Sequence, residues 1–142
     1  AFGMVGAVLN LLGLEDEIPQ TPKRPGRDYS PVLRGESIEW DDVIYYEFEN
    51  SRMIRTNDWK HTFRFPDGPD ELYDLATDPG EANNLAAKPE FADAESKMRK
   101  RLDEFFDRYA DPKYDLLHGG GSKTKLPGQP GTKPLRPETA DR

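Results

Sequence analysis

The sequence predicts an α+β fold, in which a small antiparallel four-stranded sheet packs against one long C-terminal helix. Two observations lead to this prediction. Between residues 40 and 75, short runs of aromatic and β-branched residues alternate with turn signals, a pattern typical of strands joined by tight connections. Between residues 88 and 109, apolar residues recur at the spacing of an amphipathic helix. The hydrophobic period therefore changes from about 2 to about 3.6 near Pro89.

The central segment favours strands joined in chain order as an antiparallel meander. Asn57 and Asp58 predict a tight link in its middle, and the segment 66–69 predicts a turn before the last strand. In the third strand, aromatic residues and His61 alternate with polar residues, so this strand should have one apolar face and one polar face. The four strands are expected over residues 40–48, 52–55, 59–65 and 71–75.

The long helix is expected over residues 88–109. Pro89 suits its first turn, and Asp111 with Pro112 should end it. Its apolar stripe should lie on one face of the sheet, because a helix of this kind has to bury one side. The stripe consists of Phe91, Ala94, Met98, Leu102, Phe105, Phe106 and Tyr109.

The two ends of the chain have a different character. Residues 5–14 predict a short, largely apolar helix that Gly13 ends, and the sequence then becomes polar and proline-rich. Ser30 is expected to cap one short helical turn that Gly35 terminates. From Gly119 onward, Gly, Pro, Lys and Thr dominate without periodicity, which predicts a disordered or surface-wrapping tail.

Composition excludes several functions. The net charge of -7 argues against the phosphate backbone of nucleic acids as the main partner. No apolar run approaches the roughly 20 residues of a membrane-spanning helix, so no membrane association is expected. The chain has no cysteine, which rules out a disulfide, a thiolate metal site and a cysteine nucleophile, and leaves the compartment unassigned.

Two motifs give the sequence a resemblance to a known family. Arg55-Thr56 and Trp59-Lys60 precede the segment 71–86, which reads Glu-Leu-Tyr-Asp-Leu-Ala-Thr-Asp-Pro-Gly-Glu-Ala-Asn-Asn-Leu-Ala. This order resembles the C-terminal subdomain of sulfatases, of the arylsulfatase and N-sulfoglucosamine sulfohydrolase type, where a pattern like IRT-x-x-[YW]-K precedes ELYDL-x-x-DP-x-E-x-x-NL. A looser resemblance to the end of the catalytic domain covers the segments 8–14 and 29–35.

The resemblance implies a C-terminal fragment of a sulfuric ester hydrolase. In that family a large α/β domain carries the nucleophile and the metal, and a smaller sheet-plus-helix subdomain completes the substrate pocket and supports the catalytic domain. Residues 1–35 would be the terminal strip of the catalytic domain, residues 36–117 the subdomain and residues 118–142 the tail. The expected partners are the missing catalytic domain, within one parent chain, and a sulfate-ester substrate. Such sulfatases are often exported.

No catalytic residue is expected in this chain. Sulfatases convert a Cys or Ser in a pattern like [CS]-x-P-x-R to formylglycine and hold a divalent cation, usually Ca²⁺, with Asp and Asn. The near matches at 23–27 and 132–136 begin with Lys and Thr, and at Ser30 the proline comes one place early. Ca²⁺ and formylglycine are therefore expected in the missing catalytic part, and the chain alone is expected to hydrolyse no sulfate ester.

The candidate substrate-binding residues lie on the predicted strands and the loop before them. Arg52, Arg55, Lys60 and Arg64 should form a basic cluster that could wall a sulfate-ester pocket. The alternative for this cluster is ordinary solvated charge on an open sheet face. Further candidates are Asn50, in the loop, and His61, which could instead be a half-buried, hydrogen-bonded histidine.

Two segments are expected to have structural roles. Asp74, Asp78 and Glu81 do not have the spacing of an EF-hand calcium loop. Asp78 and Asn84 should instead cap turns and the approach to the helix. His118 is expected to be a linker residue, and no metal ligand is predicted.

Two other functions stay open from the sequence. The chain could be a free-standing binding module for anionic sulfated glycans, or a structural partner that docks on a separate catalytic chain. A sulfatase nucleophile motif encoded upstream of Ala1 would favour the fragment. The sequence does not distinguish among sulfated polysaccharides, sulfated glycosaminoglycans and aryl sulfates as substrates.

Overall fold

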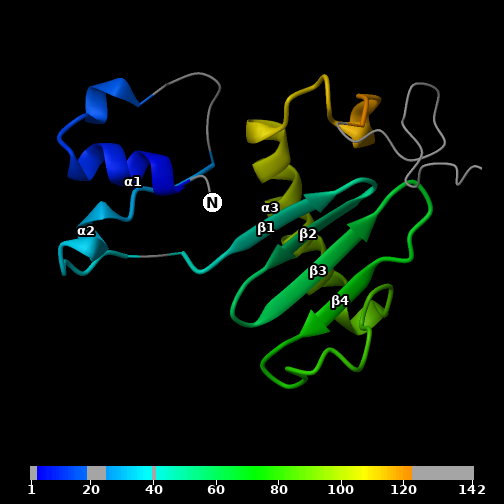
Figure 1. Cartoon of the computed structure of the whole chain (residues 1–142). Helices are drawn as coiled ribbons and strands as arrows, with labels where there is room; N and C mark the ends of the chain where they lie inside the picture. The colour runs from blue at the N-terminus through cyan, green and yellow to red at the C-terminus, as the bar shows by residue number, and fades with distance from the viewer. Residues whose placement is uncertain (1–2, 19–24, 40, 123–142) are drawn as a thin grey trace, which may run out of the picture. The chain divides into compact units, whose positions relative to one another are not determined.

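The computed structural model describes residues 3–18, 25–39 and 41–122. Its central part is a four-stranded antiparallel sheet in the order β1-β2-β3-β4, with the long helix α3 on one face (Figure 1). The predicted α+β fold is confirmed. The elements are α1 (Gly3–Leu11), η1 (Glu15–Glu17), α2 (Ser30–Leu33), β1 (Ile44–Phe48), β2 (Ser51–Arg55), β3 (Trp59–Arg64), β4 (Glu71–Asp74), η2 (Pro89–Phe91), α3 (Ala92–Tyr109) and η3 (Leu116–His118), where η denotes a 3-10 turn.

Tight connections set the register of the sheet. Phe48 pairs with Ser51 across a two-residue link in which Glu49 has a φ of 46°, and Arg55 pairs with Lys60 in the next hairpin. In that second hairpin the Thr56 N–H donates to the Trp59 carbonyl at 2.8 Å, and the Thr56 hydroxyl accepts from the Trp59 N–H at 3.0 Å. The expected tight link through 57–58 is therefore present.

The core lies between α3 and the sheet. Ile54 and Leu72 from the strands are fully buried against three helix residues. Burial of side chains of this size contributes about 1.5–3 kcal/mol each, so this contact accounts for much of the fold's stability. The helix residues are those at the centre of the predicted stripe: Met98, Leu102 and Phe106.

Aromatic contacts extend the core toward both ends of α3. Tyr45 stacks on Phe105 with ring centroids 3.8 Å apart, and Trp59 packs at a tilt on Phe91 at 6.3 Å. Phe91 and Phe105 are half-buried, as expected for the borders of an apolar stripe. The predicted packing of residues 89–109 on the sheet is confirmed, with the first turn formed by η2.

The loop after β4 covers the outer edge of that strand. The Asn84 side chain accepts from the N–H of Leu72 at 3.0 Å and donates to the carbonyl of Asp70 at 3.0 Å, and the Leu85 N–H donates to the Leu72 carbonyl. Asp78 accepts from the N–H of Asn83 at 2.8 Å, and this bond is the main reason that its pKa is lowered. The capping roles expected for Asp78 and Asn84 are confirmed.

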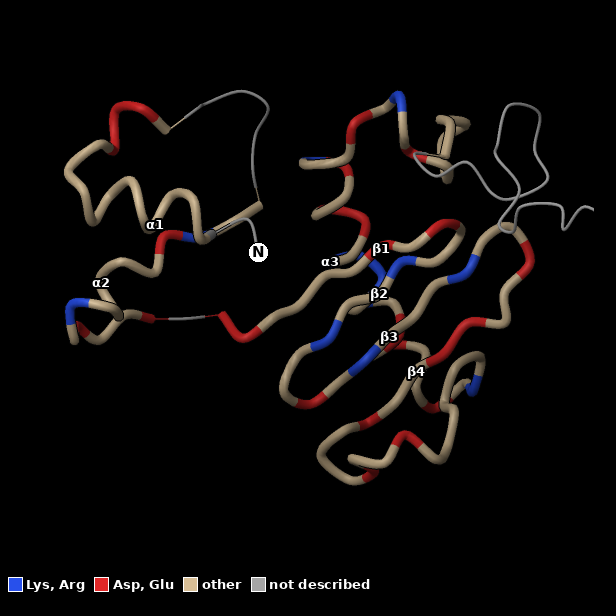
Figure 2. The backbone as a smooth tube through the Cα atoms, viewed as in Figure 1, with Lys and Arg blue, Asp and Glu red and all other residues tan. Residues whose placement is uncertain are grey.

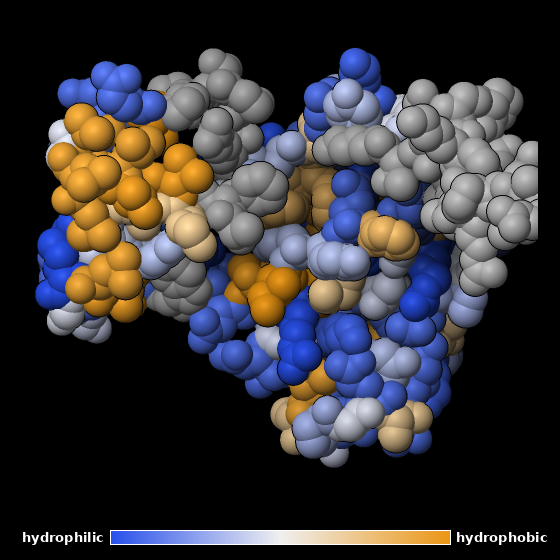
Figure 3. Space-filling view, in the orientation of Figure 1, coloured by the Kyte–Doolittle hydropathy of each residue, from blue (hydrophilic) through white to orange (hydrophobic). Residues whose placement is uncertain are grey.

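The N-terminal helices leave much apolar surface uncovered. Figure 3 shows this hydrophobic surface over α1 and α2. The expectation for Ser30 is wrong in one detail, because Ser30 is the first helical residue and Asp28 makes the capping contact, accepting from the Ser30 N–H at 2.8 Å. Among the described residues before the sheet, the exposed large apolar side chains are Met4, Val5, Val8, Leu11, Leu12, Leu14, Val32 and Leu33.

The segment 111–122 forms a compact unit of its own. The buried Asp115 carboxylate accepts from the Leu117 N–H at 3.1 Å and lies 2.9 Å from His118 Nδ1, so His118 has a structural contact where a mere linker role was expected. A Cβ at Gly120 would lie 2.5 Å from the Asp115 nitrogen, which explains the glycine there. The rest of the predicted tail and the near match at 132–136 lie outside the described residues, and the one at 23–27 lies partly outside them.

No helix within the described ranges is long and apolar enough to cross a membrane.

Candidate functional site

The two faces of the sheet carry different side chains. Partners directly opposite in an antiparallel pair lie on the same face, and successive residues of a strand alternate between faces. The pairs Arg55 with Lys60 and Ser51 with Arg64 therefore belong to one face, and the pair Ile54 with His61 to the other. α3 covers the face of Ile54 and His61, and the opposite face is called the open face below.

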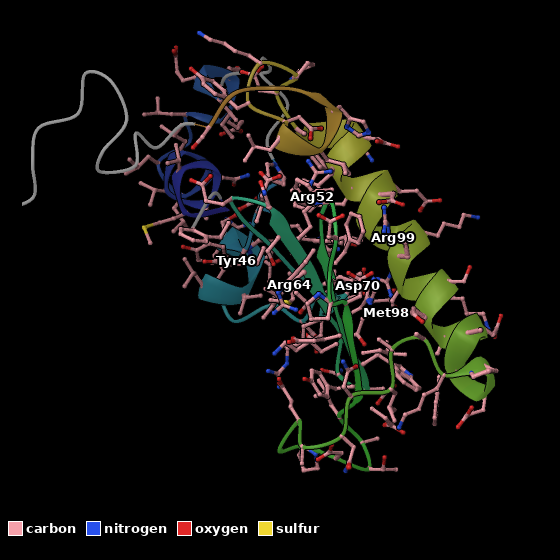
Figure 4. The ribbon with its side chains drawn as sticks, turned by 90° about the vertical axis from the view of Figure 1, so that its right-hand side faces the viewer. Tyr46, Arg52, Arg64, Asp70, Met98 and Arg99 are labelled. Carbon is pink, nitrogen blue, oxygen red and sulfur yellow. The ribbon has the colours of Figure 1, made fainter. Side chains whose placement is uncertain are left out.

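Arg52 does not belong to the basic cluster that the sequence suggested. It pairs with Phe63 in the register, which places it on the helix face, and its exposed fraction is 1%. Its Nε donates to Glu47 Oε1 at 2.9 Å, and its guanidinium lies 4.2 Å from the ring centroid of Phe106 (Figure 4). The expectation of one cluster is thus wrong, because strand alternation separates Arg52 from the other three cations.

Arg55 and Lys60 lie side by side on the open face, and both contact one carboxylate. Lys60 Nζ donates to Glu81 Oε2, and Arg55 Nη1 lies 3.9 Å from Glu81 Oε1. Lys60 also lies 5.7 Å from the ring centroid of Tyr73. About half of the Arg55 side chain is exposed, compared with 22% of the Lys60 side chain, so Arg55 is the more accessible cation.

Arg64 is held by a different set of partners on the open face. Its Nη2 lies 3.0 Å from Glu71 Oε1, and its Nη1 donates to the Pro69 carbonyl at 2.8 Å. Figure 2 shows acidic and basic residues interspersed over the sheet and its loops. Each cation of the predicted cluster forms an ion pair: Arg52 with Glu47, Arg55 and Lys60 with Glu81, and Arg64 with Glu71.

A shallow hollow lies beside Arg55. Its volume is about 460 Å³, and it opens at the end of the sheet formed by the start of β1 and the end of β2. Its lining combines the half-exposed guanidinium of Arg55 with hydroxyl, amide, carboxylate and aliphatic side chains. Its lining consists of Asp42, Val43, Ile44, Arg55, Thr56 and Asn57.

A larger hollow of about 770 Å³ lies where the β2–β3 connection meets α3. Trp59 contributes an aromatic surface, and Arg101 on α3 is already paired with Asp41 at 3.1 Å. The charges of both signs along this hollow come mainly from α3. We place the candidate site at Arg55, because Arg55 and its neighbour Lys60 are the motif cations that the sequence predicted to contact substrate.

His61 lies inside the sheet–helix interface. Its exposed fraction is 1%, and Nδ1 is 3.1 Å from the Glu71 carbonyl, so Nδ1 carries the proton and donates. Nε2 is buried and has no hydrogen-bond partner among the described residues. Burial lowers the pKa of His61 below its usual 6.5, and the nearby Arg99 acts in the same direction, while Asp70 and Glu95 oppose the shift. The hydrogen bond was expected, but the burial is deeper than the sequence indicated.

Asn50 is exposed in the β1–β2 turn, where its carbonyl accepts from the Phe65 N–H at 3.0 Å. It lies at the opposite end of β2 from Arg55, because the strand runs from Ser51 to Arg55. The structure thus divides the predicted substrate-binding residues among three places. Arg55 and Lys60 share the open face, Arg52 and His61 are buried toward α3, and Asn50 is at the far turn.

The described residues do not fit the cofactors of sulfatase chemistry. Within residues 3–18, 25–39 and 41–122, no group of three or more His, Asp or Glu side chains is arranged to hold a metal ion. No Cys or Ser in the sequence stands in the nucleophile pattern. No catalytic step is therefore assigned to these residues.

Glu81 is the site residue that the sequence reasoning missed. The sequence presented it only as a possible member of a calcium loop. The signal that could have identified it is its position in the Asp-Pro-Gly-Glu turn, which follows the strand that pairs with β3.

Comparison with known proteins identifies the family. The model of the family described as N-sulphoglucosamine sulphohydrolase, C-terminal, matches residues 6–108. The chain belongs to this family. The match includes β1 to β4, the Glu81 loop and nearly all of α3, so the open face and its cations lie inside the family domain.

Known relatives of the chain are much longer proteins. A Delta 4,5-hexuronate-2-O-sulfatase of Bacteroides thetaiotaomicron is 32% identical over 98 residues, covering 63% of this chain and 20% of the relative. An N-acetylglucosamine-6-O-sulfatase of the same organism is 31% identical over 99 residues, covering 61% and 18%. The chain thus spans about a fifth of the length of these relatives.

Solved structures agree with this assignment. A structure described as a complex with its substrate, D-glucosamine-2-N,6-O-disulfate, matches with a TM-score of 0.61 at 27% identity. That match covers 78% of this chain and 24% of the other. The sulfatase C-terminal subdomain recognised in the sequence is therefore confirmed.

Proposed function

We propose that this chain completes the substrate pocket of a sulfatase and supports its catalytic domain. The observation that carries the proposal is the amount of apolar surface left uncovered in a chain that spans about a fifth of its sulfatase relatives. Exposed apolar side chains of this number are typical of a surface that another part of a protein covers. The free-standing binding module has less support, because such a module would have to keep these side chains in water.

The uncovered apolar surface has two parts. One is on α1, α2 and the residues after them, and includes Leu12 at 66% exposure. The other is the open face of β1, where Ile44, Tyr46 and Phe48 point away from α3 and are 53–63% exposed. We propose that residues 1–35 form the end of the catalytic domain and residues 36–117 the subdomain, with residues 118–142 as a tail.

We place substrate contact at Arg55, with Lys60 beside it. An exposed guanidinium at the edge of a hollow can form charge-assisted, paired hydrogen bonds to a sulfate or carboxylate. The substrates named for the relatives and the matched structure are sulfated sugars. A sulfated sugar is therefore the substrate class that we propose here, and Ca²⁺ and formylglycine are assigned to the catalytic part outside this chain.

A chimera tests this proposal. The region of the Delta 4,5-hexuronate-2-O-sulfatase that matches this chain is replaced by the corresponding segment of this chain, and hydrolysis of a 2-O-sulfated Delta 4,5-hexuronate substrate is measured. We expect the chimera to retain turnover that a relative lacking the region does not have. Arg55→Ala in the chimera should lower kcat/KM on this substrate by the equivalent of about 1.5–3 kcal/mol of transition-state stabilisation, the contribution of a hydrogen bond to a charged group.

A minimal aryl sulfate serves as the control substrate for this variant, because it carries no sugar group that could contact Arg55. Equal losses on both substrates would indicate a folding defect in place of a lost contact. A truncated relative that keeps full activity would contradict the proposal, since it would show that the subdomain is dispensable.

A further inference from the structure

Glu81 is placed by its loop where an anionic ligand of Arg55 and Lys60 would lie. Its two carboxylate oxygens are divided between two cations, with Oε2 accepting from Lys60 and Oε1 3.9 Å from Arg55. These cations are direct neighbours across β2 and β3, so a single oxyanion on the open face can reach both. Glu81 itself comes from outside the sheet, in the loop that follows β4.

The loop holds Glu81 in position through backbone contacts. Glu81 has a φ of 54°, a left-handed conformation that is uncommon for a residue with a side chain. Its N–H donates to the Asp78 carbonyl at 3.1 Å, and the Asn83 N–H donates to the Asp78 carboxylate at 2.8 Å. The fold therefore fixes the backbone of Glu81 by contacts that do not involve Arg55 or Lys60.

The ion pair of Arg64 is different in kind. Arg64 and Glu71 both belong to strands, and their pair joins one cation to one carboxylate. Glu81 is half as exposed as Arg55, with side-chain exposures of 25% and 49%, so the contact is open to solvent from the arginine side. A ligand can therefore approach Arg55 without first entering the core.

We propose that Glu81 is a displaceable internal ligand, which occupies the anion position of Arg55 and Lys60 until a sulfate group of a sulfated sugar replaces it. This inference rests on the proposed substrate contact at Arg55. Displacement makes binding selective, because a neutral sugar offers nothing to compensate the two cations when Glu81 leaves. Glu81 would thus tune the affinity of the pocket for sulfated over unsulfated sugars.

Isothermal titration calorimetry with the full chain tests the proposal. The probes are a sulfated heparin tetrasaccharide and the same tetrasaccharide after N- and O-desulfation, which keeps its uronate carboxylates. We expect Glu81→Gln to bind the sulfated probe about 5-fold more tightly than the wild type, because the partly exposed ion pair with Lys60 and Arg55 no longer competes. Adding Arg55→Ala to Glu81→Gln should remove the gain.

The matched control is Glu71→Gln, which changes the net charge equally on the same face but faces Arg64. It should leave the affinity within about twofold of the wild type, since added positive charge alone has only a screened effect. Thermal melts establish that each variant is folded, and Glu81→Asp, with its shorter side chain, replaces Glu81→Gln if that variant does not fold. A gain on the desulfated probe equal to that on the sulfated one would overturn the assignment to sulfate.

Two failures are distinguishable. If the wild type binds, Arg55→Ala weakens it and Glu81→Gln does not strengthen it, the displacement idea is overturned and the substrate contact stands. If neither the wild type nor Glu81→Gln binds either probe, the proposed contact at Arg55 is overturned and the displacement idea with it.

Discussion

The two faces of the sheet are built from the same strands and have opposite properties. On the helix face, Ile54 and Leu72 are completely buried against α3. On the open face, Tyr46 and Phe48 of β1 are more than half exposed, and β2 and β3 carry the ion-paired Arg55, Lys60 and Arg64. The comparison teaches that one face supplies stability within this chain, whereas the other is available for contacts beyond it.

Shortening a buried side chain should give the largest difference in stability between a variant of the helix face and a variant of the open face. Leu102 is fully buried in the centre of α3, so Leu102→Ala should lower the free energy of unfolding by about 2–5 kcal/mol through lost burial and a cavity. Phe48→Ala on the open face should change it by less than about 0.5 kcal/mol. Urea unfolding followed by circular dichroism measures both values. Similar losses for the two variants would contradict the division into a stabilising and an available face.

The arginines of β2 and β3 extend the same comparison to charged residues. Arg52→Ala removes a buried charge-assisted hydrogen bond to Glu47 and a contact with Phe106, and should cost about 1.5–3 kcal/mol. Arg64→Ala removes a more exposed pair with Glu71 and should cost about 0–1 kcal/mol. The same urea experiment gives both numbers. An Arg64 variant that is as destabilised as the Arg52 variant would remove the distinction between the two positions.

Acidification should act on the helix face through His61. Because burial lowers the pKa of His61 in the folded chain, the unfolded chain binds the proton more strongly. Neutral His61 makes its full contribution to the free energy of unfolding above its unfolded pKa of about 6.5. This free energy should therefore fall as the pH drops from 7 to 5. The pKa of Asp78 is lowered from 3.8, so protonation of Asp78 changes the free energy of unfolding only at more acidic pH than the range from 7 to 5.

The control for this pH effect is His61→Leu, which removes the titrating group and keeps an apolar side chain between Ile54 and Leu72. Its free energy of unfolding should decline less between pH 7 and pH 5 than that of the wild type. An identical decline in both proteins would show that other groups are responsible.

The fold could be predicted from the sequence because its signals are local. In β3 the aromatic residues and His61 alternate strictly with polar ones, so the period alone places Trp59 and Phe63 on the helix face. The stripe from Met98 to Phe106 likewise needs only helical spacing. The capping of the β4 loop followed from the turn chemistry of Asp78 and Asn84.

The candidate site was less accessible to sequence reasoning because its contacts are not local. In β2, cations occupy both faces, and only the pairing of Arg52 with Phe63 shows that this arginine is buried. Glu81 meets Lys60 across 21 positions of the chain, through a loop whose path the sequence does not specify. The burial of His61 likewise depends on α3, which begins more than 30 residues later in the sequence.

Sedimentation velocity of the isolated chain tests the central claim most directly, namely that its uncovered apolar surface is made to be covered by the rest of a sulfatase. We expect the wild type to self-associate as its concentration rises, because exposed apolar patches associate in water. The variants Val8→Ser with Leu12→Ser, and Tyr46→Ser with Phe48→Ser, should each shift the chain toward the monomer without lowering its stability by more than about 1 kcal/mol. A wild-type chain that stays monomeric at high concentration, with sedimentation equal to that of both variants, would contradict the account.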